Sequence, residues 1–267
     1  MNNARIAAIQ MISTSRIEEN LRTAARWIAE AAAQGAELVV LPEYFPIIGR
    51  DDADKIAVRE TEGNGPIQDF LAATAQRRKL WIIGGSLPLQ ASTDNKVRNT
   101  CLVFDPQGKQ VARYDKIHLF DFQKDEQHYN ESATIEPGVQ PVAFDTPFGR
   151  IGLSICYDLR FPELFRALGK IDLLVLPAAF TEVTGRAHWE ILLRARAIEN
   201  QCYVLASAQG GKHQNRRETH GNSMLIDPWG EILARRDKDA GIIIGDMDHE
   251  RIAEVRSNLP ALAHRVM

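Results

Sequence analysis

One cysteine of the chain, Cys156, has the surroundings of a nucleophile. It follows the apolar run 150–155 and precedes Pro162, a residue that suits the first turn of a helix. A thiol at such a strand-to-helix turn lies at the carboxyl end of a sheet, where the backbone N–H groups that follow can bind an oxyanion. We therefore expect Cys156 to attack a carbonyl carbon, with the N–H of Tyr157 as an oxyanion donor. Taken alone, Cys156 is equally compatible with a buried structural cysteine.

A thiol nucleophile needs a base or a cation beside it, because a free cysteine with a pKa of about 8.5 is mostly protonated at neutral pH. Glu43 follows the apolar run 38–42, which predicts a carboxylate at the end of a buried strand. Lys116 ends a predicted hairpin strand, and its ammonium could lower the thiol pKa and stabilise an oxyanion. Without other support, a satisfied loop glutamate and a surface lysine are the commoner interpretations.

Other chemistries have less support in the sequence. A papain-like pair of Cys156 with His118, His188 or His220 lacks the cysteine signature of such enzymes, and it would leave the carboxylates without a role. The chain contains no CxxC or HExxH motif, so the sequence predicts neither a metal nor a cofactor.

The predicted elements alternate between strands and helices. In the first half, strand signals at 5–11, 38–41 and 80–84 alternate with helix signals, the first of which has the capping-box spacing of Ser15 and Glu18. The second half repeats this order, with strands at 150–155, 171–176 and 201–208 and helices at 162–168 and 186–200.

An internal repeat supports two similar halves. Residues 100–116 align without gaps on residues 222–238 and share Asp-Pro, Gly, Ala-Arg and Asp-Lys, so that Lys116 matches Lys238. The run before Glu43 likewise matches the run before Ala178, where no carboxylate occurs. We predict an α/β fold in which two pseudo-symmetric αβ halves pack as a four-layer αββα sandwich.

Composition limits the possible partners. The 267 residues carry 32 Lys plus Arg against 35 Asp plus Glu, and a net charge of −3 gives no basic field for nucleic acid. No signal peptide or apolar run of membrane-spanning length occurs, and three cysteines without paired spacing favour a reducing compartment, so we expect a cytoplasmic protein that does not bind membranes. Cys101 and Cys202, both in apolar runs, are expected to be structural.

The domain organisation follows from the same patterns. No linker separates the halves, so residues 1–267 are expected to form a single domain. The polar segment 256–267 has no evident partner in the sequence and is a candidate to pack on a second subunit.

Four segments carry a family resemblance. LPEYF, YDKIHLFD, YNES and GLSICYDLRFPE occur in this order and contain Glu43, Lys116, Glu131 and Cys156 respectively. Together they closely resemble the nitrilase superfamily of carbon–nitrogen hydrolases, and the resemblance continues through GRAHWEILLRARAIENQCYV to a terminal LPALAHR. Within the superfamily the chain looks most similar to the deaminated-glutathione amidases, and next to the ω-amidases.

The resemblance implies a mechanism. Glu43 would accept the Cys156 proton and return it to the departing amine, while Lys116 and the Tyr157 N–H stabilise the oxyanion. Glu131 is a candidate on the resemblance alone, as a supporting carboxylate that orients Lys116 and Glu43. The implied reaction is hydrolysis of an amide bond through a thioester, without a cofactor.

The resemblance also implies an αββα sandwich that assembles as a homodimer or higher homo-oligomer. The expected substrate is deaminated glutathione, and the alternative is a small ω-amide such as α-ketoglutaramate. A non-catalytic interaction protein on the same fold is the alternative of another class. Four residues are candidates for substrate contact: Arg160, Phe180, Thr181 and His188. One departure, Asn222 where many relatives carry His, bears on substrate choice.

Overall fold

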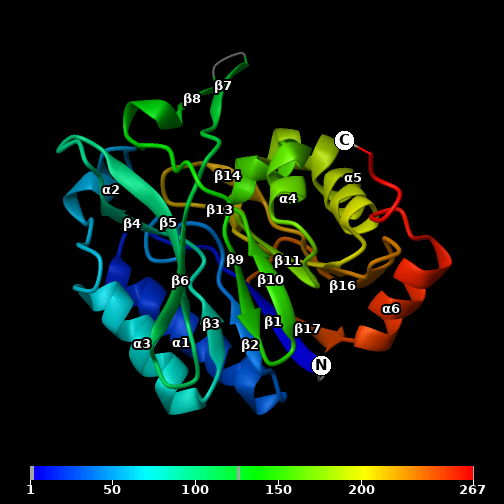
Figure 1. Ribbon diagram of the computed structural model, residues 1–267. Helices are drawn as coiled ribbons and strands as arrows, with labels where there is room; N and C mark the ends of the chain where they lie inside the picture. Colours follow the sequence, from blue (N-terminus) through cyan, green and yellow to red (C-terminus); the bar gives the residue numbers. More distant parts are fainter. Residues whose placement is uncertain (1–2, 125–126, 267) are drawn as a thin grey trace.

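The computed structural model describes residues 3–124 and 127–266, which form mixed sheets covered by helices (Figure 1). The first half contains β1 (Ala4–Gln10), α1 (Ile17–Ala33), β2 (Leu38–Val40), α2 (Asp54–Ala57), α3 (Pro66–Arg78), β3 (Trp81–Ile83), β4 (Leu87–Gln90), β5 (Val97–Phe104), β6 (Gln110–Asp115), β7 (Asp121–Lys124), β8 (Gln127–Asn130) and the 3₁₀ helix η1 (Glu131–Ala133).

The second half contains β9 (Ala143–Thr146), β10 (Gly149–Leu153), the 3₁₀ helix η2 (Cys156–Arg160), α4 (Pro162–Ala167), β11 (Leu173–Ala178), α5 (Glu182–Asn200), β12 (Tyr203–Ala208), β13 (Gly210–Lys212), β14 (Glu218–His220), β15 (Ser223–Ile226), β16 (Ile232–Arg236), β17 (Gly241–Met247) and α6 (His249–Asn258). None of the helices within the described ranges is long and apolar enough to span a lipid bilayer.

The two large sheets have matching topologies. Within the described residues, the first sheet has the order β17-β1-β2-β3-β5-β4, with β6 also paired to β5. The second has the order β16-β15-β12-β11-β10-β9. In each, an antiparallel strand flanks three parallel strands, and a hairpin extends the other side. The predicted pseudo-symmetric halves are therefore present.

The repeated hairpins agree residue by residue. In the first, Cys101 pairs with Tyr114, and the register shifts at a bulge after Val103. In the second, Ser223 pairs with Arg236, and the register shifts at the matching place after Leu225. An identical register with an identical bulge shows that the sequence repeat is a structural repeat.

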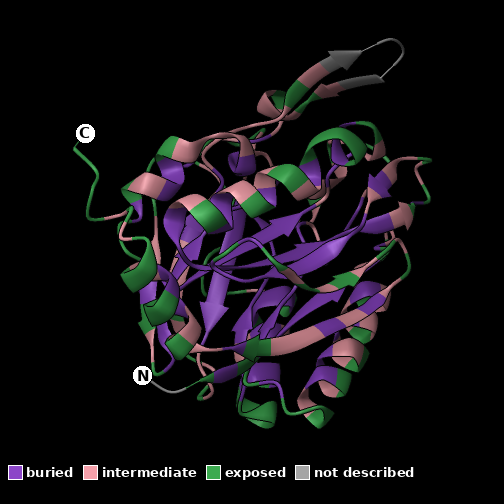
Figure 2. Cartoon of the chain, turned by 90° about the vertical axis from the view of Figure 1, so that its right-hand side faces the viewer, coloured by how far each residue is buried: buried purple, intermediate pink, exposed green. Residues whose placement is uncertain are grey.

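The layers are stacked as predicted. Helices α1 and α3 cover the first sheet through an apolar cluster that includes Ile28 and Leu71. A second cluster fills the space between the sheets and continues to the helices α4 and α5 through residues such as Leu176 and Trp189. Figure 2 shows the buried strands between helices whose outer faces are exposed. Because the central strands are buried on both faces, their sequences are continuous apolar runs and do not alternate between apolar and polar residues. The four-layer αββα fold is confirmed.

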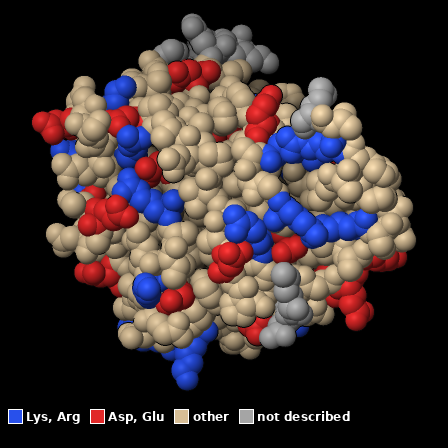
Figure 3. Space-filling model, in the orientation of Figure 1, with Lys and Arg blue, Asp and Glu red and all other residues tan. Residues whose placement is uncertain are grey.

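Charge is mixed on the surface. On the face drawn in Figure 3, acidic side chains lie beside the basic ones.

Two helix starts differ from the sequence prediction. The first helix begins at Ile17 after Arg16, with no side-chain cap, so the capping box of Ser15 and Glu18 is wrong. Helix α5 begins at Glu182, four residues before the predicted start, because the Thr181 hydroxyl accepts a hydrogen bond from the N–H of Thr184.

The start of the C-terminal segment is bound to its own chain. Arg256 forms an ion pair of 3.0 Å with Asp172, and the Gln201 side chain donates to the carbonyl of Leu259. Packing of the segment 256–267 on a partner subunit stays a prediction, and Met267 lies outside the described residues.

Candidate active site

Cys156 lies at a strained turn between β10 and α4. It is the first residue of η2, has a φ of 50°, and is 8% exposed. A positive φ is uncommon for a residue with a side chain and is concentrated at functional sites. Tyr157 follows as the second residue of η2, where the N–H groups of a helix have no acceptor within the helix.

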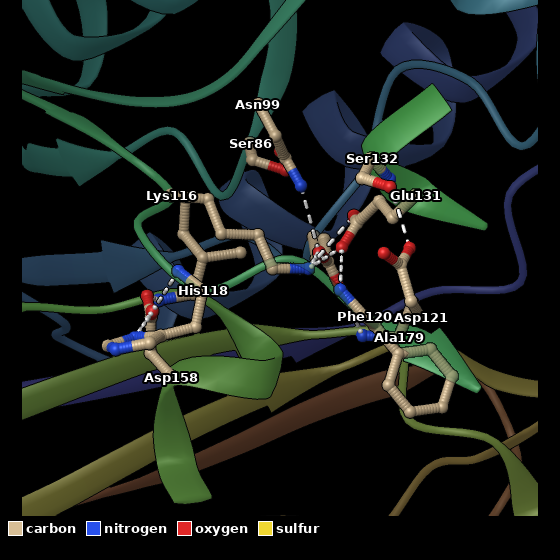
Figure 4. A network of polar contacts seen from close by, with 12 residues as sticks. Ser86, Asn99, Lys116, His118, Phe120, Asp121, Glu131, Ser132, Asp158 and Ala179 are labelled. Carbon is tan, nitrogen blue, oxygen red and sulfur yellow. Dashed lines mark hydrogen bonds and ion pairs between the residues drawn. The ribbon is translucent and has the colours of Figure 1, made fainter. Parts of the chain in front are cut away.

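The buried carboxylate of Asp158 stabilises this turn through hydrogen bonds. One of its oxygens accepts from the Ile155 N–H at 2.9 Å and from the Tyr114 hydroxyl at 2.6 Å. The other accepts from the His118 N–H and contacts the His118 ring nitrogen Nδ1 at 2.7 Å. Asp158 thereby joins the turn to the end of the β5–β6 hairpin, from which Lys116 also extends (Figure 4).

Glu43 follows β2 and is 1% exposed. Its Oε1 accepts from the Asn99 amide at 2.9 Å and from Lys116 Nζ at 3.0 Å, and its Oε2 accepts from the Ala179 N–H at 2.8 Å. Ala179 follows β11, so a backbone group of the second half fixes the carboxylate of the first half. Three donors hold the Glu43 carboxylate in one orientation.

Lys116 lies between two carboxylates. Its Nζ donates to Glu43, and it also contacts both Glu131 oxygens at 2.9 and 2.8 Å, as Figure 4 shows. Glu131 in turn accepts from the Tyr44 hydroxyl at 2.9 Å and from the Phe120 N–H at 2.7 Å. The four predicted catalytic side chains thus meet at one end of the two sheets, although they are up to 113 positions apart in the sequence, from Glu43 to Cys156.

The charges determine the protonation of this cluster. Burial alone would lower the pKa of Lys116, but the negative charges of Glu131 and Glu43 outweigh it and raise the pKa well above its usual range. Burial would likewise raise the pKa of Glu131, but Lys116 lowers it overall. The Lys116 ammonium is therefore held in its charged form beside an ionised Glu131 carboxylate.

The thiol is not activated in advance. Burial first, and then the negative charge of Glu43, raise the pKa of Cys156 well above its usual range, against the opposing charge of Lys116. Cys156 is therefore a neutral thiol at neutral pH, and it needs a base at the moment of attack.

Two recesses meet at Cys156. The larger, about 890 Å³ up to its open mouth, is lined by Glu43, Lys116 and Glu131 and by residues of α2 and of the β13–β14 region. The smaller, about 200 Å³, is lined by the candidates Arg160, Phe180 and Thr181 together with Cys156. Both recesses are concave and largely apolar, as small-molecule sites usually are.

The four candidates for substrate contact divide into two groups. Arg160, Phe180 and Thr181 line the smaller recess, and the Arg160 guanidinium lies 5.3 Å from the centre of the Phe180 ring. His188 is exposed and outside both recesses, but its Nδ1 lies 3.1 Å from Arg160 Nη1. His188 therefore contacts Arg160 and does not line either recess at Cys156.

The alternatives of the sequence have other contacts. His118 contacts Asp158, His188 contacts Arg160, and His220 lies 3.1 Å from Glu182. Within residues 3–124 and 127–266, no group of three or more His, Cys, Asp or Glu side chains is arranged to hold a metal ion. Asn222 does not line either recess, and its side chain accepts hydrogen bonds from Arg235.

Sequence reasoning missed the groups that hold the cluster in place. Asn99, Tyr44 and Asp158 gave no motif of their own, although Tyr44 and Asp158 stand directly beside predicted residues in LPEYF and ICYD. The Ala179 N–H could not be found, because every residue other than proline has such a group.

The comparisons with known proteins place the chain in a family. The carbon–nitrogen hydrolase family model matches residues 5–257. A deaminated glutathione amidase of Synechocystis sp. is 46% identical over 266 residues, which cover 97% of this chain and 97% of the relative. Human omega-amidase NIT2 is 38% identical over 277 residues, covering 99% and 96%.

A solved structure agrees with the sequence relatives. The NitFhit protein of C. elegans superposes with a TM-score of 0.89 at 37% identity, over 100% of this chain and 66% of that longer protein. Sequence and structure therefore lead to the same conclusion: this chain belongs to the carbon–nitrogen hydrolase family of the nitrilase superfamily.

Proposed function

We propose that the protein is an amidase that hydrolyses a small amide through a thioester on Cys156. The observation that carries this proposal is the buried set of Glu43, Lys116 and Glu131 in the same recess as Cys156, where two recesses join. A base, a fixed cation and a nucleophile in one pocket are the groups that acyl transfer requires.

The first half-reaction begins with proton transfer from the Cys156 thiol to Glu43. The sulfur attacks the amide carbon, a C–S bond forms, and the carbonyl electrons move to oxygen. Lys116 Nζ and the Tyr157 N–H stabilise this oxyanion. When the intermediate collapses, the C–N bond breaks and Glu43 gives the proton to the departing amine, which leaves a thioester and an ionised Glu43.

The second half-reaction uses the same groups. Glu43 takes a proton from a water molecule that attacks the thioester, and the C–S bond breaks as the acid product forms. Glu43 then returns the proton to the departing sulfur of Cys156. Glu131 holds Lys116 in position throughout, because its two oxygens accept from Nζ and the Tyr44 hydroxyl, which donates to one of them, fixes the carboxylate.

We infer that the substrate is deaminated glutathione. This is the activity named for the relative from Synechocystis sp., which covers the chain almost completely. Hydrolysis would release an α-keto dicarboxylate and the dipeptide Cys-Gly. The smaller recess offers Arg160 for the carboxylate of the acyl portion and Phe180 and Thr181 for its carbon chain.

A small ω-amide such as α-ketoglutaramate is the second candidate, because the human relative at 38% identity is named an omega-amidase. The two substrates share the same acyl portion and differ only in the leaving amine. Comparing kcat/KM for the two compounds decides between them.

The experiment that tests the chemistry is mass spectrometry of the intact protein. After brief exposure to either amide, the wild-type protein should gain the mass of the acyl group, and Cys156→Ser should not accumulate this thioester. If no amide, nitrile or carbamoyl compound gives an adduct or a product, the non-catalytic interaction protein is the better explanation.

The expected homodimer has a candidate surface. Ile191 and Ile198 on helix α5 are 68% and 47% exposed, and Trp229 beside Gly230 is 52% exposed. A Cβ on Gly230 would meet Ile198, so the hairpin tip lies against this helix. Light scattering should give twice the mass of the chain.

A cytoplasmic location rests on the three cysteines, which are unpaired and buried.

A further inference from the structure

Two cations line the larger recess away from the acyl-binding side. Lys55 lies on α2, and Arg217 lies just before β14. Both face Asp52, at 3.9 Å from Lys55 Nζ and 2.8 Å from Arg217 Nη2. A single carboxylate therefore lies between two positive charges.

The other carboxylates of the recess are engaged or solvated. Glu43 and Glu131 are bound by Lys116, Glu218 lies 3.0 Å from Lys238, and Asp51 is exposed.

The Lys55 ammonium lacks the partners that a buried cation normally has. Its side chain is only 12% exposed, and within the described residues no atom accepts a hydrogen bond from its Nζ. Asp52 lies 3.9 Å away, beyond hydrogen-bonding distance, the centre of the Tyr44 ring is 5.4 Å away, and the charge of Glu131 also acts on the ammonium. Burial lowers the pKa of Lys55, against the charge of Asp52. Because Lys55 lines the recess, its three N–H donors can bind an anion there.

Arg217 also has unused donors. Its Nη2 donates to Asp52, and the guanidinium lies 5.4 Å from the centre of the Tyr129 ring. The side chain is 40% exposed, so its remaining N–H groups face the recess or solvent. A guanidinium and an ammonium that share one carboxylate can hold a second one.

The position of Glu43 decides which end of the substrate reaches these cations. Glu43 and Lys116 line the larger recess and not the smaller one, whereas Cys156 lines both. Because Glu43 must protonate the departing nitrogen, the amine lies on the side of the larger recess. The acyl chain then occupies the smaller recess beside Arg160.

We propose that Lys55 and Arg217 bind a carboxylate on the leaving amine, which makes the larger recess a site for an amino acid or dipeptide released by the reaction. This inference rests on the proposed amidase function and adds its specificity for the amine. An amide whose leaving group is ammonia does not reach the two cations. The pair therefore selects amides of peptide-like amines over simple ω-amides.

The test compares three amides with a common acyl portion: one of Cys-Gly, one of the same dipeptide ending in a carboxamide, and one of ammonia. For Lys55→Met we expect kcat/KM on the first amide to fall about 10–100-fold, mostly through KM, since uniform binding is lost. For the carboxamide-ended amide and the ammonia amide, kcat/KM should change less than about twofold. Arg217→Gln should give the same pattern, and Lys212→Met, an exposed lysine outside the recess, should leave all three unchanged.

Two results would overturn the inference. One is an equal loss on all three amides, which would mean that Lys55 supports the catalytic groups instead of binding the amine. The other is an unchanged KM for the carboxylate-ended amide in both variants. Activity on the ammonia amide reports that each variant is folded. If the wild-type protein hydrolyses none of the three, the proposed function itself fails, and this inference fails with it.

Discussion

The two halves of the molecule end the same hairpin with a lysine, but in different surroundings. Lys116 is 1% exposed and lies between the buried carboxylates of Glu43 and Glu131. Lys238, its match in the repeat, is 41% exposed and pairs with Glu218 at 3.0 Å and Glu182 at 3.1 Å. The backbone register and bulge are the same, so the difference comes from the side chains that surround each lysine.

The strand ends differ in the same way. The parallel pair β1–β2 of the first half corresponds to the pair β10–β11 of the second half. When their registers are aligned, Met11 is the counterpart of Cys156, and Ala178 is the counterpart of Glu43. Met11 forms an isolated bridge to Gln209 of the second half, where the Gly210 N–H donates to its carbonyl at 2.8 Å, whereas Cys156 begins a 3₁₀ helix at positive φ. Each half supplies groups that the other lacks. We call the surroundings of Lys116 the first corner and those of Lys238 the second corner, and the proposed catalytic groups lie at the first.

The largest difference between the corners should come from the carboxylates. Glu43→Gln keeps the shape but removes the base, so we expect kcat to fall about 10²–10⁴-fold. Glu182→Gln removes the carboxylate beside Lys238 and should change kcat by less than about twofold. Steady-state amide hydrolysis measures both, and a similar loss in the two variants would mean that the second corner also serves the reaction.

Removing the lysines should give the next largest difference. Lys116→Met removes the proposed oxyanion donor, so we expect kcat to fall about 10²–10³-fold. It also leaves buried carboxylates without their cation, which destabilises the fold by about 3–5 kcal/mol. For Lys238→Met we expect the free energy of unfolding to fall by less than about 1 kcal/mol, because the ion pairs of Lys238 are partly exposed.

Urea unfolding and kinetics should be measured on the same preparations of the two lysine variants. A Lys116→Met protein with wild-type stability would show that the carboxylates take up protons or water in place of the ammonium.

A smaller effect is expected at the turn that distinguishes Cys156 from Met11. Asp158→Asn replaces a carboxylate that accepts hydrogen bonds from Ile155, Tyr114 and His118. We therefore expect the free energy of unfolding to fall by about 1–3 kcal/mol. A displaced thiol should also lower kcat about tenfold or more. The control is Asp145→Asn on β9, whose side chain is 78% exposed. If kcat stays unchanged while stability falls, Asp158 supports the fold and does not position the thiol.

The placement of the cluster could be predicted because strand ends are visible in the sequence. Glu43 and Cys156 each follow an apolar run, and the carboxyl ends of parallel strands in a sheet lie at one edge. The broken symmetry at Ala178 was visible as well. The proposed role of Glu131 came from the family resemblance, and that of Lys116 needed its support, since an isolated lysine or loop glutamate has no distinguishing pattern.

The rest depended on packing, which a linear pattern does not contain. The start of α5 was missed because Gly185 suggests a break, but a Cβ there would collide with His220, so the glycine allows close packing within the helix. The pairing of Lys55 and Arg217 with Asp52 joins residues 165 positions apart. Such contacts exist only after the chain has folded.

The smallest expected effect concerns the pH dependence of the second corner. Burial would raise the pKa of Glu182, but hydrogen bonds from Arg186, His220 and Lys238 lower it from 4.5 to about 2. The folded state therefore binds this proton more weakly than the unfolded state does. The resulting stabilisation is complete above about pH 4.5 and is lost as the pH falls through about 2.

Glu182→Gln should consequently lower the free energy of unfolding by about 1 kcal/mol at pH 6, a typical value for a partly exposed ion-pair network. The difference from the wild-type protein should shrink towards pH 2, because protonation removes the same charge from the wild-type carboxyl. Urea unfolding at a series of pH values measures this difference. A difference that does not change with pH would mean that Glu182 acts through packing at the start of α5, and that the ion pairs around Lys238 contribute nothing measurable.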